Sequence, residues 1–259
     1  MSSSDPTSRF SDRVADYVRT RPGYPPEVLD LLRREGLTPD VVIADVGSGT
    51  GLSAEMFLKA GHTVYGVEPN REMREAAESR LAGYPSFHSV TGTAEATTLP
   101  TGSIGAVVAG QAFHWFDTAK ARDEFSRILR PPGIVVLLWN TRKLDTTPFL
   151  RAYEALLHRF GTDYKEVVHT NVDRTALRAF FGGDFEARVL PNEQMFDREG
   201  LRGRLRSSSY TPPPGHPNHE PMLRELDHIF DVHARGGTVR FEYDTELYFR
   251  WLATTPTRS

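Results

Sequence analysis

The chain has 259 residues, of which 39% are hydrophobic and 25% are charged, an ordinary composition for a folded globular protein. Its formal net charge of −3 provides no large positive field to attract a nucleic acid or an anionic membrane, so neither is an expected partner. The sequence contains no cysteine, which excludes disulfides and thiol chemistry. The longest apolar run, residues 134–139, is far shorter than the roughly 20 residues of a membrane helix. We therefore expect a cytoplasmic protein.

The first 140 residues alternate between strand and helix patterns. Pro22, Pro25 and Pro26 separate two short helical segments that end at Gly36. Beyond them, β-branched runs predict strands at residues 41–46, 63–67, 87–90, 104–109 and 134–139. Helical spacing lies between most of these strands, over residues 52–61, 72–83 and 118–129. This alternation predicts an α/β fold with a Rossmann-like, doubly wound and mostly parallel sheet.

Helices dominate the rest of the chain. They are expected near residues 148–160, 174–181, 198–205 and 221–234, with strands at 185–190 and 239–243. The last strand is expected to be antiparallel in a sheet of seven. We expect a single domain, 1–259, with an N-terminal segment (1–36), a core (37–140), a helical cover over the strand ends (141–182 and 197–236) and returning strands (183–196 and 237–259). The Pro-rich stretch 207–221 predicts an irregular loop, either a lid or plain surface.

The strongest functional signal is VVIADVGSGTG, residues 41–51, where a predicted strand ends in Gly47, Gly49 and Gly51 before a helix. Glycines in such a turn let backbone N–H groups approach a ligand where a Cβ would clash. Glu68 falls at the end of the second predicted strand, where a carboxylate can accept hydrogen bonds from both hydroxyls of a ribose. Together these features indicate a ligand that contains a nucleoside.

The spacing of the glycines bears on which nucleoside is bound. A dinucleotide fingerprint places its third small residue at position 52, which is Leu52 here, and no Tyr/Lys catalytic pair is evident. An NAD-dependent oxidoreductase is therefore the disfavoured alternative. A non-catalytic nucleoside-binding module is a second alternative, against which the intact turn and acid argue.

The Gly-x-Gly-x-Gly turn preceded by Asp45 resembles motif I of the class I methyltransferases. With FSDRVADYVRTRPGYP, VEPNREM, GTAEATTLP, QAFHWFD and LRPPGIVVLLWN, it resembles the type 11 methyltransferase group that includes trans-aconitate methyltransferase-like proteins. The resemblance implies S-adenosylmethionine as the cofactor, no metal, and methyl transfer to a small molecule such as a carboxylic acid or a hydroxyl compound. Nucleic acid is again disfavoured, because the sequence after the fourth strand is AGQAFHW rather than an Asn-Pro-Pro-aromatic signature. Whether the protein is a monomer or a homodimer is left open.

The resemblance also implies a cofactor site, residue by residue. The methionine and ribose side is lined by Asp45, Gly47, Ser48, Gly49 and Gly51, the ribose by Glu68, the adenine face by Pro69, Asn70 and Met73, and the adenine edge by Thr93, Ala94 and Glu95. Thr93 stands where the family commonly has Asp, so the backbone N–H of Ala94 or the Glu95 carboxylate would substitute. Asp45, Met73 and Glu95 also have plain alternatives as a turn cap, a core residue and a solvated acid.

Aromatic residues complete the expected site. The resemblance implies that the N-terminal segment (1–36) covers the cofactor. Within this segment Tyr24, and less strongly Tyr17, could cover the sulfonium by cation–π attraction, or could simply pack over the sheet. After the fourth strand, Gln111 is expected at the cofactor, and His114 and Trp115 at the acceptor. His114 would act as the general base or hold a carboxylate, with a purely structural imidazole as the alternative.

Looser candidates for acceptor contacts are Arg142, Tyr153, Ser209 and Tyr210. His216 and His219 form the only metal-like spacing noted, and we interpret that pair as surface residues.

Overall fold

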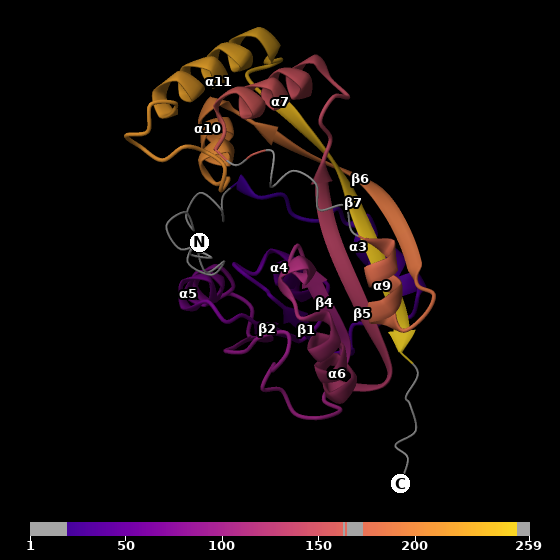
Figure 1. Ribbon diagram of the computed structural model, residues 1–259. Helices are drawn as coiled ribbons and strands as arrows, with labels where there is room; N and C mark the ends of the chain where they lie inside the picture. Colours follow the sequence, from indigo (N-terminus) through magenta and orange to yellow (C-terminus); the bar gives the residue numbers. More distant parts are fainter. Residues whose placement is uncertain (1–19, 163, 165–172, 253–259) are drawn as a thin grey trace. The chain divides into compact units, whose positions relative to one another are not determined.

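The computed structural model describes residues 20–162, 164 and 173–252 (Figure 1). Contacts divide the chain into two compact units. The sheet unit comprises Gly23–Asn140, Val172–Leu190 and Thr245–Ser259, and the helical unit comprises Met1–Pro22, Thr141–Asn171 and Pro191–Asp244. Tyr17 lies outside the described residues.

The seven strands form one sheet in the order β3-β2-β1-β4-β5-β7-β6. Their bounds are β1 Ile43–Val46, β2 Val64–Val67, β3 Phe87–Val90, β4 Ile104–Gly110, β5 Leu129–Arg142, β6 Glu186–Phe196 and β7 Val239–Leu252. Strands β3, β2, β1, β4 and β5 pair in parallel. Asn140 of β5 contacts Thr245 and Lys143 contacts Glu242, so residue numbers fall along β7 as they rise along β5, and β7 is antiparallel. The predicted fold class is confirmed.

Alternate residues of the central strands face opposite sides of the sheet, as the two-residue period of a strand requires. Ile43 of β1 packs on one side, in a core with α3 (Glu27–Arg34) and α4 (Leu52–Lys59). Ala44 packs on the other side, in a core with α6 (Thr118–Ile128) and α9 (Arg174–Phe181). Helix α5 (Arg71–Arg80) contacts β3. Both faces of the sheet are therefore covered, which explains the near-continuous apolar runs of β1 and β4.

The helical unit has its own apolar core. It is formed by α7 (Pro148–Phe160), α10 (Arg198–Arg206) and α11 (His219–His233), which pack with residues of β7 that include Phe241. Helices α7 and α10 begin at capping residues, because the side chains of Thr147 and Asp197 accept hydrogen bonds from backbone N–H groups of the first turn.

Several features differ from the sequence-based expectation. Strands β5 and β6 are longer than expected, because β5 begins at Leu129 and ends at Arg142 and β6 ends at Phe196. Strand β7 continues nine residues beyond Tyr243. Thr245 and Leu247 are buried and Glu246 between them is only half-buried, so the two-residue period of burial continues past Tyr243.

Helix α9, which the sequence analysis grouped with the helical cover, packs in the core of the sheet unit. His219, expected at the surface, is buried instead. It is the first residue of α11, which was expected to begin at Pro221, and its Nδ1 lies 2.8 Å from the Pro212 carbonyl oxygen. Whether the remaining cover segments close over the strand ends stays a prediction.

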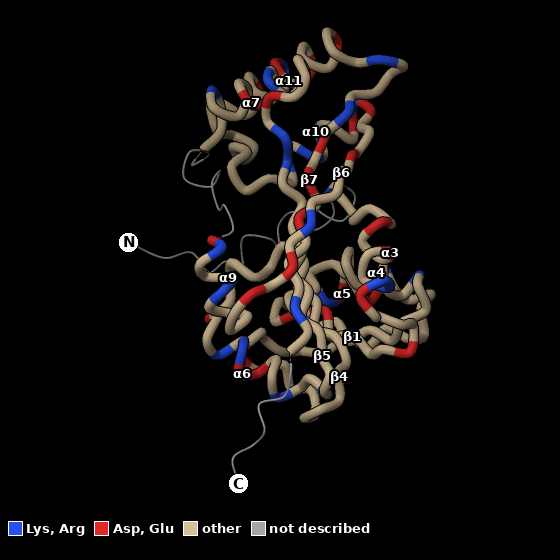
Figure 2. Tube along the Cα trace, turned by 90° about the vertical axis from the view of Figure 1, so that its right-hand side faces the viewer, with Lys and Arg blue, Asp and Glu red and all other residues tan. Residues whose placement is uncertain are grey.

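Charged residues of both signs are interspersed along the helices of each unit (Figure 2). Within the described ranges, no helix combines the length and apolarity needed to cross a membrane. Those ranges also hold no group of three or more His, Cys, Asp or Glu residues arranged to bind a metal ion.

Candidate functional site

The predicted cofactor residues follow four parallel strands of the sheet unit. Asp45 to Gly51 end β1, Glu68 to Met73 follow β2, Thr93 to Glu95 follow β3, and Gln111 to Trp115 follow β4. The carboxyl ends of parallel strands share one edge of a sheet, so these segments meet at the edge where ligands bind in doubly wound folds.

The three glycines of the first turn have different roles. All have positive φ, +69° at Gly47, +54° at Gly49 and +79° at Gly51, a region that strongly favours glycine. A Cβ on Gly47 would lie 2.6 Å from the Ala112 Cβ, and one on Gly51 would lie 2.6 Å from the Leu81 Cδ1. A Cβ on Gly49 would meet no atom within 4 Å from any other described part of the chain. Gly47 and Gly51 therefore serve packing, and Gly49 keeps space free at the strand edge.

The Glu68 carboxylate lies beside that space. Its Oε2 accepts the Gly49 N–H and its Oε1 accepts the Asn70 N–H, both at 2.9 Å. Burial raises the pKa of Glu68, and these N–H groups and the nearby Arg74 guanidinium oppose the increase. A carboxylate can accept about four hydrogen bonds, so both oxygens keep capacity for a pair of ligand hydroxyls.

Asp45 is fully buried at the end of β1. Its Oδ2 accepts a hydrogen bond from the Ser53 hydroxyl at 2.7 Å, and its Oδ1 has no partner within the described structure. Burial raises the pKa of Asp45 to about 7. The hydrogen bond from Ser53 opposes this increase, and the negative charge of Glu68 adds to it. An unsatisfied buried carboxylate oxygen beside a glycine turn is suited to a polar or cationic ligand group.

The segment after β2 combines structural and candidate ligand roles. The Asn70 side chain caps α5 by accepting the Met73 N–H at 3.0 Å, and Met73 itself is buried. Pro69 is exposed, and its carbonyl accepts a hydrogen bond from Arg74. The plain interpretation of Met73 as a core residue therefore agrees with its burial, and contact with an adenine ring stays a prediction.

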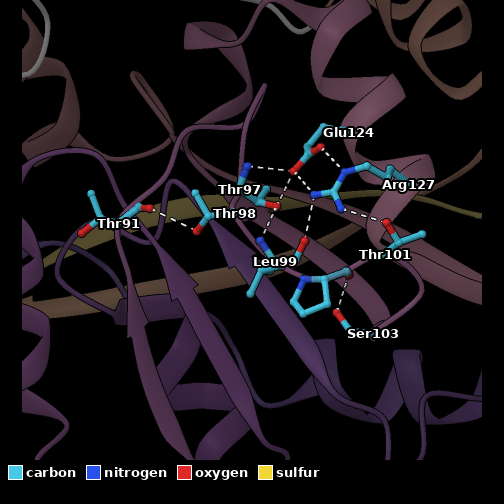
Figure 3. A network of polar contacts seen from close by, with 9 residues as sticks. Thr91, Thr97, Thr98, Leu99, Thr101, Ser103, Glu124 and Arg127 are labelled. Atoms are coloured by element: carbon cyan, nitrogen blue, oxygen red, sulfur yellow. Dashed lines mark hydrogen bonds and ion pairs between the residues drawn. The ribbon is translucent and has the colours of Figure 1, made fainter.

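The loop after β3 is fixed by a polar network that the sequence did not reveal (Figure 3). Glu124 of α6 accepts hydrogen bonds from the backbone N–H and the hydroxyl of Thr97, and it binds Arg127 through both carboxylate oxygens. Arg127 also donates to the Leu99 carbonyl at 2.8 Å. The Arg127 hydrogen bonds, followed by those of Thr97, lower the pKa of Glu124 to about 2. In the sequence, the one hint of this network is that Glu124 stands three residues before Arg127 on a predicted helix.

This network holds the predicted adenine-edge residues in place. Thr93 is exposed and pairs with Ala96 through backbone hydrogen bonds, whereas Ala94 is buried in the core. The Glu95 Oε1 accepts the Asp117 N–H at 2.8 Å. One Glu95 oxygen is therefore already used to hold the start of α6, which limits this residue as a substitute for the missing Asp.

The segment after β4 carries the expected acceptor residues. Gln111 has a left-handed backbone, with φ of +58°, and its side chain donates to the Asn140 carbonyl at 3.0 Å. The exposed rings of His114 and Trp115 lie 4.6 Å apart between centroids, and Trp115 is 51% exposed. The His114 imidazole is therefore not a buried core residue, and its contact with an acceptor stays a prediction. Surrounding protein atoms nevertheless desolvate the ring enough to lower the pKa of His114.

Tyr24 lies over the same strand end, because its hydroxyl occupies the space that a Cβ on Gly110 would need, 2.5 Å away. The looser acceptor candidates Arg142, Tyr153, Ser209 and Tyr210 belong to the helical unit. Their position relative to the turn of β1 stays a prediction.

Comparison with known proteins identifies the family. Residues 44–137 match the family described as "Methyltransferase domain". An uncharacterized methyltransferase of Mycobacterium tuberculosis is 38% identical over 164 residues, 63% of this chain and 65% of the relative, so the chain spans about two thirds of that relative's length. One of Bacillus cereus is 32% identical over 152 residues, 53% of this chain and 69% of the relative.

Fold comparison agrees with the sequence matches. A candidate type II methyltransferase of Anaeromyxobacter dehalogenans has the same fold, with a TM-score of 0.69 and 19% identity over 90% of this chain and 98% of its own. The chain therefore belongs to the class I S-adenosylmethionine-dependent methyltransferases. The residues present suit the cofactor, since free space at Gly49, an unsatisfied Asp45 oxygen and the Glu68 carboxylate lie at one strand edge.

Proposed function

We propose that the protein transfers a methyl group from S-adenosylmethionine to a small-molecule acceptor. The observation that carries this proposal is the free space at Gly49 next to the buried Glu68 carboxylate, within a chain of methyltransferase sequence. When bound, S-adenosylmethionine supplies an activated methyl group on a sulfonium. The residues of this chain then have to hold the nucleoside, align the acceptor and exclude water.

In this proposal Glu68 accepts hydrogen bonds from the ribose hydroxyls, and Asp45 faces the amino-acid part of the cofactor through its free Oδ1. The packed glycines Gly47 and Gly51 hold the turn in shape, and Gly49 leaves room for the ligand. The backbone of Ala94 and the side chains of Asn70 and Met73 border the adenine. The shared strand edge and the family resemblance support these proposed positions.

We propose a carboxylic acid or a hydroxyl compound as the acceptor, in keeping with the resemblance to trans-aconitate methyltransferase-like proteins. A carboxylate is ionised at neutral pH and needs no base, so His114 would only position it. A hydroxyl acceptor needs its proton removed, and the exposed, predominantly neutral His114 imidazole could accept that proton.

Calorimetry with the purified protein tests the cofactor half of the proposal. S-adenosylmethionine and its demethylated product should bind, and NAD should not, because the turn lacks the third small residue of a dinucleotide fingerprint at position 52. Binding of NAD in preference to S-adenosylmethionine would instead support the oxidoreductase alternative. A screen of carboxylic acids, phenols and amines with labelled donor then identifies the acceptor, and cofactor binding without labelling of any acceptor class would favour a non-catalytic module.

A further inference from the structure

The helical unit contains two buried arginines around a tyrosine. Arg142 ends β5, Arg204 lies on α10, and Tyr153 lies on α7. Arg204 is 5% exposed and Tyr153 is fully buried. The Arg142 guanidinium carbon lies 5.2 Å from the centroid of the Tyr153 ring, and both arginines interact electrostatically with the Tyr153 hydroxyl. We call these three residues the Arg–Tyr cluster.

The charges around the Arg–Tyr cluster do not balance. Arg142 pairs with Glu154 at 2.5 Å, and the Glu154 carboxylate also accepts a hydrogen bond from Tyr164. Arg204 has no carboxylate partner in the described part of the chain, and its Nη1 donates to the neutral hydroxyl of Ser208 at 3.0 Å. Two guanidinium groups therefore face one carboxylate, which leaves one buried positive charge without a counter-charge.

Several polar atoms in the Arg–Tyr cluster are also unsatisfied. The Arg142 Nη1, the Arg204 Nε and the Tyr153 hydroxyl are buried without hydrogen-bond partners within the described structure. All three can donate a hydrogen bond, and burial raises the pKa of Tyr153, so its hydroxyl keeps its proton at neutral pH. A buried charge without a partner is strongly unfavourable, so this arrangement is explained if an anion completes it.

We propose that the Arg–Tyr cluster is a binding site for the carboxylate group of a small organic acid. A carboxylate carries the single negative charge that the cluster lacks, whereas a phosphate monoester would bring close to two at neutral pH. The two oxygens of a carboxylate can also accept hydrogen bonds from the guanidinium N–H groups of Arg142 and Arg204 that have no partner within the described structure. The site lies within the helical unit and does not depend on the identity of the bound nucleoside.

The test compares organic acids with their neutral amides on the full chain. Butanoate and benzoate, against butanamide and benzamide at constant ionic strength, would be titrated by calorimetry and thermal unfolding. At least one acid should bind about tenfold or more tightly than its amide and should raise the melting temperature. Equal binding of both acids and their amides would overturn the proposal, and stronger binding of inorganic phosphate would overturn the carboxylate assignment.

Substitutions locate the effect. Arg204→Met should abolish the preference for acid over amide, and the variant without ligand should melt no lower than the parent, because a buried unpaired charge has been removed. Arg206→Met, two residues along α10 and exposed, is the matched control and should bind acids like the parent. If Arg204→Met does not fold, Tyr153→Phe keeps the ring and should weaken acid binding about two- to tenfold. Unchanged acid binding in either folded variant would overturn the site.

Discussion

The backbone N–H of Gly49 donates a 2.9 Å hydrogen bond to the Oε2 of Glu68, joining the turn after β1 to the end of β2. Among the described residues, no atom apart from those of Gly49 and its two chain neighbours lies within 4 Å of the position that a Cβ on Gly49 would occupy. A buried carboxylate is thus fixed at the border of free space, and the glycines of this turn can be tested one by one.

Substitution of the glycines should separate folding from ligand binding. Gly47→Ala and Gly51→Ala place a Cβ 2.6 Å from the carbon of another side chain, so both should lower the free energy of unfolding by several kcal/mol. Gly49→Ala adds a methyl group that contacts no other described residue, so it should cost only the left-handed backbone strain, about 1–2 kcal/mol. It should nevertheless weaken cofactor binding markedly. Urea unfolding and calorimetry on the three variants measure both effects, and normal affinity in Gly49→Ala would contradict a ligand at this position.

Glu68→Ala should weaken binding of S-adenosylmethionine by roughly 2–4 kcal/mol, through loss of two charge-assisted hydrogen bonds to the ribose. Glu68→Gln keeps one acceptor for the Gly49 or Asn70 N–H and should fold better while still binding weakly. Glu78→Gln, exposed on α5, is the control. Calorimetry on folded protein decides, and unchanged affinity in Glu68→Ala would remove this residue from the ribose site.

Asp45 should make the ligand-free protein less stable as pH rises. Its folded pKa, about 7, lies above the ordinary value of 3.8, so the folded state holds the proton more tightly. The protonated Asp45 therefore adds to the free energy of unfolding below pH 4. This contribution, on the order of 4 kcal/mol, is lost as pH rises towards 7. Asp45→Asn should flatten this dependence and melt at a higher temperature than the parent at pH 8. If the melting temperatures of the parent and of Asp45→Asn changed with pH in the same way, Asp45 would have an ordinary pKa.

Glu124 should have the opposite pH dependence. Its folded pKa, about 2, lies below the ordinary 4.5, so its stabilising effect is present above pH 4.5 and is lost as pH falls towards 2. Glu124→Gln should cost about 1–3 kcal/mol at pH 7 and much less at pH 2.5. Urea midpoints at the two pH values measure the difference. A cost of equal size at both would mean that the Arg127 and Thr97 contacts do not depend on the carboxylate charge.

His114→Ala should reduce turnover about 10²–10⁴-fold if the acceptor is a hydroxyl compound and His114 is the base. Because the pKa of His114 is lowered, activity of the parent should rise with pH through a value below the 6.5 of free imidazole and then level off. For a carboxylate acceptor the loss should appear mainly in the acceptor KM. His88→Ala, on the exposed strand β3, is the control. Full turnover in His114→Ala, with the true acceptor, would exclude both roles.

The sequence predicted the sheet and its ligand-bearing edge because both depend on local patterns. Strand β1 is apolar on both faces, and Gly49 and Glu68 lie at fixed positions after their strands. Glu124 could not be identified in the same way, because its role depends on a contact with Thr97, 27 residues earlier, across a loop without periodicity. Arg204 was missed for a similar reason, since a basic residue on an amphipathic helix is usually solvated and nothing local shows that it is buried.

The network in Figure 3 also bears on the thermodynamics of nucleoside binding. Glu124 and Arg127, which lie on α6, bind Thr97 and Leu99 in the loop after β3. The backbone of this loop is therefore immobilised when the chain folds rather than when the ligand binds. The conformational entropy of that loop is thus lost before binding begins. Association of the adenosine part should therefore show little of the heat-capacity change that accompanies coupled folding, and loosening α6 should introduce one.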